Sequence, residues 1–372
     1  MTDAHAPPRI AKTFHTLILQ PTTLCNLNCA YCYLPDRKRQ RLMSKAVAES
    51  CAASIAEQAS SSAVDVVWHG GEPTTTPLSH FTSLLEAFEP LRRAGQVRHN
   101  IQTNGTLLTA EWLDLFLHYD IRVGLSVDGP QAANAERVDW GGHETWQRTM
   151  RGARLLSASG LPFSVICVVT PATIDRVNEL ADFFAGLGCE SVGFNLEEQE
   201  GSDRPEIDEE DAYHFWRRLV ERRMGGEVLR IRDLDRLAEH LGSAAAAETH
   251  VVFDPIPTVA YNGQAVLLSP ELLGIDDPNY GDFVAGNVLS QSLPAMLVAS
   301  HSLRYVREFD QALRDCAASC DFYSFCRGAQ AGNRYFELGT FAATETRYCR
   351  TTKQALVRAA SDVLVREEVK TT

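Results

Sequence analysis

The sequence has 372 residues, of which 45% are hydrophobic and 22% are charged, as in an ordinary globular protein. Its net charge of −13 argues against general nucleic-acid binding, which needs clustered cations, so we expect no nucleic-acid partner. No apolar run is long enough to span a membrane and the N-terminus has no signal-peptide pattern, so we expect a cytoplasmic protein without a membrane partner.

Short β-like runs alternate with helical patterns in the first half of the chain. Six strands are predicted at 16–20, 64–69, 98–104, 121–128, 162–170 and 191–198. The helices between them are predicted from about Ser44, and near 79–92, 109–118, 145–158 and 173–186. Regular β-α alternation predicts a parallel sheet covered by helices, and six units predict a partial (β/α)6 TIM-like barrel.

The pattern changes after the sixth strand. An acidic loop over 197–213 leads into a helix over about 209–224. Residues 251–268 read as two short strands around Asn262–Gly263, a dipeptide typical of hairpin turns. An amphipathic helix over about 351–368 follows further helical segments.

These changes divide the chain into five parts. We expect a tail, the barrel, a bridging helical segment, a smaller domain with the hairpin, and a C-terminal helix, at 1–14, 15–200, 201–250, 251–350 and 351–372.

Seven of the ten cysteines fall into two groups, at 25–32 and 316–349. Clustered thiols in a cytosolic chain bind metal more often than they form disulfides. Cys25, Cys29 and Cys32 follow the first strand, and no fourth Cys or His stands in their loop. Three thiolates can hold three irons of a cubane cluster and leave the fourth iron open. A zinc ion, which usually takes four ligands, is the alternative.

The C-x3-C-x2-C spacing with Tyr31 before the last cysteine, together with "WHGGEP" at 68–73, resembles the signature of the radical SAM superfamily. The resemblance implies that the three cysteines hold a 4Fe–4S cluster whose open iron chelates S-adenosylmethionine. Cleavage of that molecule would give a 5′-deoxyadenosyl radical that abstracts a hydrogen from the substrate. The residues expected to bind S-adenosylmethionine are Tyr31, Gly70, Gly71, Glu72, Pro73, Thr103, Asn104, Ser126, Arg137, Phe194 and Asn195.

The region 316–349 resembles the SPASM extension of radical SAM enzymes that modify peptides. Its cysteine run departs from the SPASM pattern, because Gln330 stands where a fourth cysteine is expected and 251–283 has no cysteine. The resemblance therefore implies a truncated SPASM-like α+β extension with one auxiliary 4Fe–4S cluster, and two clusters per chain. The auxiliary ligands would be Cys316, Cys320, Cys326 and Cys349. Zinc remains an alternative for these four thiols.

Within this family the sequence is most similar to cyclophane-forming maturases, which join an aromatic ring carbon to a side-chain β-carbon. This implies a precursor peptide with a leader as the substrate, and an electron donor such as flavodoxin or ferredoxin. Asp254, Glu271 and Asp128 are candidates for the base that takes the ring proton. The 251–268 hairpin is a candidate edge for leader pairing. Thioether-forming or sulfatase-maturating chemistry, and a non-catalytic zinc or iron–sulfur protein, are the alternatives.

Overall fold

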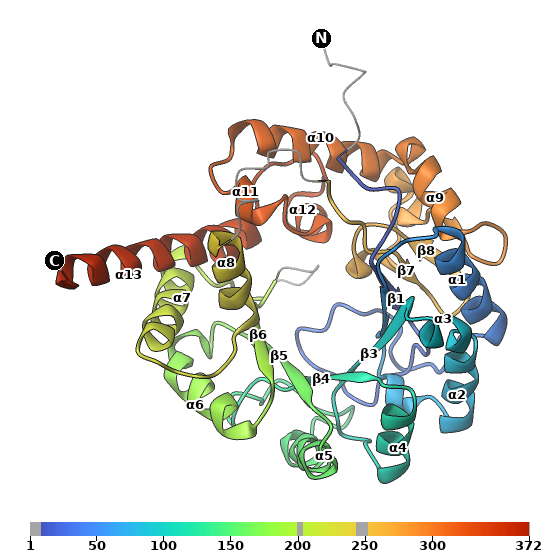
Figure 1. The fold of residues 1–372 in the computed structure, drawn as a ribbon, viewed down its shortest axis with the longest axis horizontal. Helices are drawn as coiled ribbons and strands as arrows, with labels where there is room; N and C mark the ends of the chain where they lie inside the picture. The colour runs from blue at the N-terminus through green and yellow to red at the C-terminus, as the bar shows by residue number, and fades with distance from the viewer. Residues whose placement is uncertain (1–8, 199–203, 243–251, 372) are drawn as a thin grey trace.

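The structure is a computed structural model that describes residues 9–198, 204–242 and 252–371 (Figure 1). Parts of the expected segments lie outside the described residues. These are 1–8 of the tail, 199–203 of the acidic loop, 243–250 of the bridging segment, 251 of the hairpin and 372 of the C-terminal helix.

Six parallel strands form the first part of the sheet, as predicted. They are β1 Thr16–Leu19, β2 Val64–Trp68, β3 Val97–Thr103, β4 Arg122–Ser126, β5 Phe163–Val169 and β6 Ser191–Leu196. Each strand pairs in parallel with the next one along the chain. Figure 1 shows the strands curving around a central space with helices outside them, so the predicted partial barrel is confirmed.

The helices between these strands cover the outer face of the sheet. They are α1 Lys45–Glu57, α2 Leu78–Glu86, α3 Glu89–Arg93, α4 Ala110–His118, α5 Trp146–Ser159 and α6 Val177–Leu187. The single helix predicted near 79–92 is two helices. Pro90 lies in the first turn of α3, where its missing N–H is tolerated, and it cannot continue the hydrogen bonds of α2.

The predicted hairpin extends the same sheet. β7 Thr258–Val259 pairs in parallel with β1 and antiparallel with β8 Gln264–Val266. β8 in turn pairs with β9 Gly286–Asn287, which is the sheet's edge strand. Both hairpin strands therefore have a neighbour on each side. Within the described part of this segment, residues 252–268, neither strand has a free edge, so the prediction that a leader adds to this hairpin is wrong.

The remaining helices lie at the two ends of the strand order. Helices α7 Glu209–Met224, α8 Arg232–Gly242 and α13 Ala355–Thr371 are on the side of β6, α9 Leu293–Ala299 and α10 Arg304–Ser319 are toward the hairpin, and α11 Tyr323–Cys326 and α12 Ala331–Leu338 lie between these two groups (Figure 1). The barrel core and a second apolar cluster, which includes Phe283, Tyr305 and Phe309, are separate. Among the described helices, none has the length and hydropathy needed to cross a bilayer.

Candidate active site

Three thiols follow β1 on a loop that is held on both sides by backbone hydrogen bonds. The Cys25 N–H donates to the Arg37 carbonyl (2.9 Å) on one side, and the Asn28 N–H donates to the Val138 carbonyl (2.7 Å) on the other. Cys25 and Cys29 are each 9% exposed, and both line the main cavity together with Cys32. The cavity has a volume of about 390 Å³ and opens at the carboxyl ends of the barrel strands.

A glycine turn after β2 packs directly against the cysteine loop. Gly71 has φ +61°, and a Cβ atom there would lie 2.6 Å from the Leu24 carbonyl oxygen. The Glu72 N–H donates to the same carbonyl at 2.8 Å. Only glycine permits this approach, so the turn and the cysteine loop form one unit.

The buried Glu72 carboxylate ties the end of β2 to the end of β3. It accepts hydrogen bonds from the Thr74 N–H and hydroxyl (3.0 and 2.6 Å), the Thr103 hydroxyl (2.7 Å) and the Asn104 N–H (2.7 Å). Burial raises the pKa of Glu72, and these donors oppose that shift. The Asn104 amide also donates to Asn26 Oδ1 at 3.0 Å. Thr103 and Asn104 line the cavity, and their hydrogen bonds to Glu72 and Asn26 also position the cavity walls.

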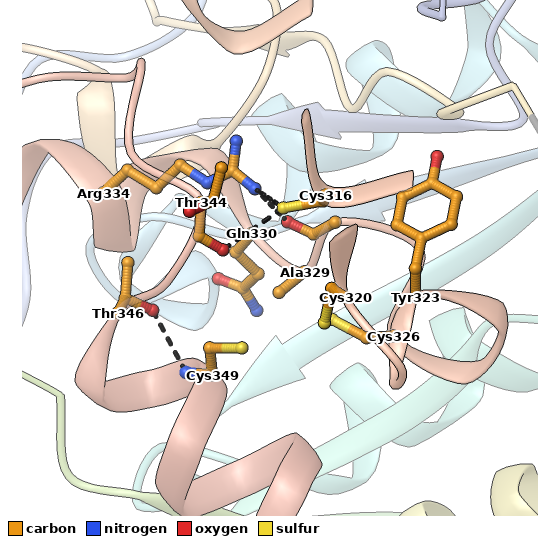
Figure 2. A pocket seen from close by; sticks show the side chains of 11 residues that line it. Cys316, Cys320, Tyr323, Cys326, Ala329, Gln330, Arg334, Thr344, Thr346 and Cys349 are labelled. Carbon is orange, nitrogen blue, oxygen red and sulfur yellow. Dashed lines mark hydrogen bonds between the residues drawn. The ribbon is translucent and has the colours of Figure 1, made fainter. Parts of the chain in front are cut away.

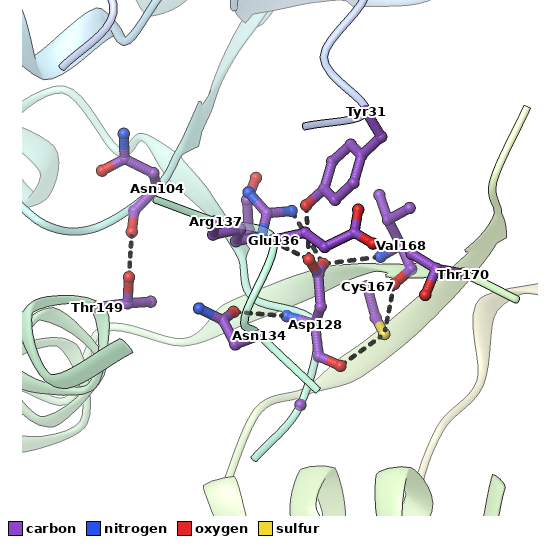
Figure 3. Close-up of polar contacts among 12 residues, drawn as sticks. Tyr31, Asn104, Asp128, Asn134, Glu136, Arg137, Thr149, Cys167, Val168 and Thr170 are labelled. Atoms are coloured by element: carbon purple, nitrogen blue, oxygen red, sulfur yellow. Dashed lines mark hydrogen bonds and ion pairs between the residues drawn. The ribbon is translucent and has the colours of Figure 1, made fainter. Parts of the chain in front are cut away.

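Arg137 and Tyr31 converge on a second buried carboxylate, Asp128 (Figure 3). Arg137 donates through Nε and Nη2 (2.9 and 3.0 Å), Tyr31 through its hydroxyl (2.5 Å) and Val168 through its N–H (2.9 Å). Asp128 is 2% exposed and is not among the residues that line the cavity, whereas Tyr31 and Arg137 are. Because Asp128 accepts from four donors and does not line the cavity, it does not fit the role of a base; it orients Arg137 and Tyr31.

Neighbouring side chains in β4 and β6 point alternately toward the cavity and away from it. Ser126 and Asn195 face the cavity, where they accept hydrogen bonds from Gln102 (2.7 Å) and Arg232 (2.8 Å). Phe194 is 1% exposed and packs against aromatic rings of the covering helices. Adjacent strand residues point to opposite faces, so Phe194 cannot line the ligand site as expected.

Glu271 and Glu198 are two carboxyl groups in the lining of the cavity. Both line the main cavity; Glu271 accepts a hydrogen bond from the Ser269 hydroxyl, and Glu198 accepts one from the Asn333 amide. Burial and then the charge of Glu271 raise the pKa of Glu198 to about 8. Burial also raises the pKa of Glu271. Carboxyl groups with high proton affinity beside a ligand cavity are suited to proton transfer.

The third candidate base, Asp254, lies elsewhere. Its half-exposed carboxylate contacts His15 Nδ1 at 3.1 Å, just before the start of β1. This is the amino end of the parallel strands, whereas the cavity lies at their carboxyl ends. Asp254 therefore does not fit the role of a base at this site.

Three residues that line the cavity are not among those expected there from the sequence: His69, Glu198 and Gln330. His69 shares a 3.1 Å hydrogen bond with the Tyr33 hydroxyl, and burial lowers its pKa to about 4. His69 stands beside the glycine turn, so its neighbours in "WHGGEP" were the signal available. Glu198 and Gln330 come from segments that only the fold brings to the cavity.

Figure 2 shows the second group of cysteines around a smaller cavity. Cys316, Cys320, Cys326 and Cys349 all line it. Buried Arg334 donates from Nη2 to Cys316 Sγ (3.6 Å) and to the Gly328 carbonyl (3.1 Å). Gln330 lines both this cavity and the main one, so the two sites share a wall.

Both groups of thiols fit the clusters that the sequence resemblance implies. Thiolates are the ligands of iron–sulfur clusters, three of them line a cavity large enough for an additional small molecule, and four line the second. Within the described segments, no three His, Cys, Asp or Glu side chains are placed to hold a single metal ion. All ten cysteines are free of disulfides.

Comparison with known proteins agrees with the family resemblance found in the sequence. The sequence model of the radical SAM superfamily matches residues 19–184. An uncharacterized protein from Synechocystis sp. is 31% identical over 90% of this chain and 88% of its own. A serine-type anaerobic sulfatase-maturating enzyme from Bacteroides thetaiotaomicron is 24% identical over 87% of this chain and 84% of its own.

Two solved structures share the fold. Native anSMEcpe with bound AdoMet superposes with a TM-score of 0.76 at 22% identity, over 96% of this chain and 100% of that one. Streptococcus suis SuiB bound to its precursor peptide SuiA superposes with a TM-score of 0.64 at 18% identity, over 88% and 74% of the two chains.

Proposed function

Because the chain belongs to the radical SAM superfamily, we propose that it modifies a ribosomally made precursor peptide by joining an aromatic ring carbon to a side-chain β-carbon. The observation that carries this proposal is one cavity lined by three thiols and by two buried carboxyl groups, Glu198 and Glu271. A relative named as a sulfatase maturase and a neighbour bound to a precursor peptide support a peptide substrate. We place the enzyme in the cytoplasm, where its thiols stay reduced.

Each of the two groups of thiols would hold one iron–sulfur cluster. Cys25, Cys29 and Cys32 would hold the 4Fe–4S cluster, and Cys316, Cys320, Cys326 and Cys349 would hold an auxiliary one. When bound, the first cluster and S-adenosylmethionine supply a 5′-deoxyadenosyl radical that removes one hydrogen atom from the substrate. Ring closure also releases one electron, for which the auxiliary cluster is the proposed acceptor, and one proton.

The residues of the chain would orient the ligand and take that proton. Gly71 lines the cavity and lets the glycine turn pack against the cysteine loop, and Arg137, held by Asp128, would bind the carboxylate of the ligand. Tyr31, Ser126 and Asn195 line the same space. Glu271 is the proposed base, because it lines the cavity beside Glu198, whose pKa burial and the charge of Glu271 raise to about 8.

The direct test is co-expression with the precursor peptide encoded beside the gene. We expect a loss of two hydrogens per crosslink, and tandem mass spectra with no fragments between the joined residues. Sulfatase maturation, the second candidate, is favoured by the relatives and would change a single residue without blocking fragmentation.

Cofactor chemistry is tested separately. Cys25→Ala/Cys29→Ala/Cys32→Ala should abolish 5′-deoxyadenosine formation and keep about four irons per chain, the load of the auxiliary cluster. No 5′-deoxyadenosine from the wild-type protein with dithionite would exclude the enzyme and leave the non-catalytic metal protein.

A further inference from the structure

The segment that flanks the cysteine loop on its outer side carries a run of cations in an acidic protein. Residues 37–41 read Arg-Lys-Arg-Gln-Arg, whereas the whole chain has a net charge of −13. The segment is bonded to the loop, since the Thr23 N–H donates to the Arg41 carbonyl (3.1 Å) and the Cys25 N–H to the Arg37 carbonyl (2.9 Å). The charge therefore sits directly beside the thiols that line the main cavity.

Neighbouring carboxylates do not neutralise all the cations of residues 37–41. Arg41 pairs with Asp36 at 3.2 Å. Lys38 and Arg39 are exposed, and Arg37 is half-buried with a hydrogen bond to Asn28 Oδ1 (3.3 Å). Within the part of the chain that the structure describes, none of these last three forms an ion pair. An excess of three positive charges remains on this face.

An exposed aromatic ring completes the face. The Trp140 side chain is 38% exposed, with Lys38 Nζ 4.5 Å from the centre of its ring and the Arg37 guanidinium at 5.5 Å. Its indole N–H donates to the Cys25 carbonyl at 2.8 Å. One hydrogen bond thus links a surface ring to a residue of the three-cysteine loop. We call Arg37, Lys38, Arg39 and Trp140 the basic face.

We infer that the basic face is the docking surface for a flavodoxin, a small acidic carrier of single electrons. The inference rests on the proposed function, in which the donor loses one electron and the cluster on Cys25, Cys29 and Cys32 gains it. Electron-transfer complexes have small interfaces that depend on charge complementarity for fast encounter. An exposed indole offers the flat apolar contact that suits the edge of a flavin ring.

The basic face can be reversed without touching the cavity. Lys38→Glu/Arg39→Glu changes two exposed side chains. Lys12→Glu/Arg122→Glu is the matched control, because it makes the same charge change at two exposed positions at the amino end of the sheet, away from the cavity. Iron content and circular dichroism show that both variants are loaded and folded.

The first readout is binding of purified oxidised flavodoxin to the anaerobically loaded protein, by calorimetry. We expect the affinity of the wild type to fall about tenfold or more from about 50 mM to about 500 mM NaCl, as for an interface steered by charge. The Lys38→Glu/Arg39→Glu variant should lose about tenfold in low salt, and the control should stay within about twofold. Unchanged affinity in the reversed variant, equal loss in the control, or tighter binding of a ferredoxin would overturn the inference.

The second readout is 5′-deoxyadenosine formation with flavodoxin and its reductase, or with excess dithionite. The reversed variant should be slowed with flavodoxin and match the wild type with dithionite. Equal slowing with both reductants would overturn the docking surface. No product from the wild type with dithionite would instead overturn the proposed function, while the binding measurement would still decide on the surface.

Discussion

Burial and the neighbouring charge of Glu271 raise the pKa of Glu198, and both carboxyl groups line the same cavity as the cysteine loop. The two residues have different proposed roles: with a pKa of about 8, Glu198 is mostly protonated at about pH 7, and Glu271 is the proposed base. The charges of Glu337 and Lys353 also act on Glu198, in opposite directions. This asymmetry gives different expectations for two similar substitutions.

Glu271→Gln should lower crosslink formation by about a hundredfold or more and leave 5′-deoxyadenosine formation in place, because hydrogen abstraction does not need the base. Glu198→Gln should keep most of the crosslinking at about pH 7, since an amide resembles the protonated acid. The ratio of crosslink to 5′-deoxyadenosine measures both. The pH profile adds a check: burial raises the pKa of Glu271, so the wild-type ratio should fall as acid protonates it. Equal losses in the two variants would contradict the assignment.

Gly71→Ala should displace the cysteine loop, because the new Cβ would lie 2.6 Å from the Leu24 carbonyl oxygen and 2.7 Å from that of Thr22. We expect a loss of about four irons per chain, the load of one cluster. Gly95→Ala is the control: Gly95 also has a positive φ, +71°, but a Cβ there meets nothing within 4 Å. Iron analysis compares them, and full loading of the Gly71→Ala protein would show that the close approach is not needed.

Arg334→Gln should lower the reduction potential of the auxiliary cluster. The guanidinium, 3.6 Å from Cys316 Sγ and 4.7 Å from the centre of the Phe309 ring, places a buried positive charge that favours the more negative, reduced state. Arg334→Lys keeps the charge and should shift the potential less. An EPR-monitored redox titration in the Cys25→Ala/Cys29→Ala/Cys32→Ala background isolates this cluster. Identical potentials in the three proteins would exclude an electrostatic role.

His99 should make stability depend on pH in the weakly acidic range. Trp68 Nε1 donates to its Nδ1 at 3.2 Å, and burial lowers its pKa from 6.5 to about 4. Below pH 6.5 the unfolded chain binds a proton that the folded chain does not, so folding stability falls as pH decreases toward 4.

The slope from this residue approaches about 1.4 kcal/mol per pH unit. Urea unfolding of the loaded protein between pH 7.5 and 5.5 measures it. His99→Gln, which keeps an acceptor for Trp68, should flatten the curve, whereas exposed His118→Gln should not. Parallel curves for the wild type and His99→Gln would contradict this.

The barrel was predictable because short β-like runs alternate regularly with helical patterns in the first half of the chain. The cysteine loop and the glycine turn were equally predictable, because the C-x3-C-x2-C spacing and the "WHGGEP" motif both indicate the chemistry of the site. Phe194 and Asn195 are neighbours in β6 and point to opposite faces of the sheet, so only Asn195 of this expected pair lines the cavity, and the sequence alone does not show which of the two does.

The carboxylates were harder to assign. Asp128, Asp254 and Glu271 look alike in the sequence, and only the fold separates a saturated acid, an acid at the wrong end of the sheet and one in the cavity wall. Glu198 could not be found from the sequence, because its position depends on Asn333 of α12, far along the chain.

The cysteine loop lies between two segments that each bond to its backbone, around Arg37 and Val138. Whatever binds the three thiols therefore stabilises all three stretches of chain together, by the free energy of its binding to the folded state alone. Loss of that ligand should loosen the region as a unit, with faster amide exchange in both flanking segments than in β1. The resistance of the cysteine loop and its flanking segments to local unfolding, and hence to proteolysis, would therefore show whether the three thiols hold their ligand.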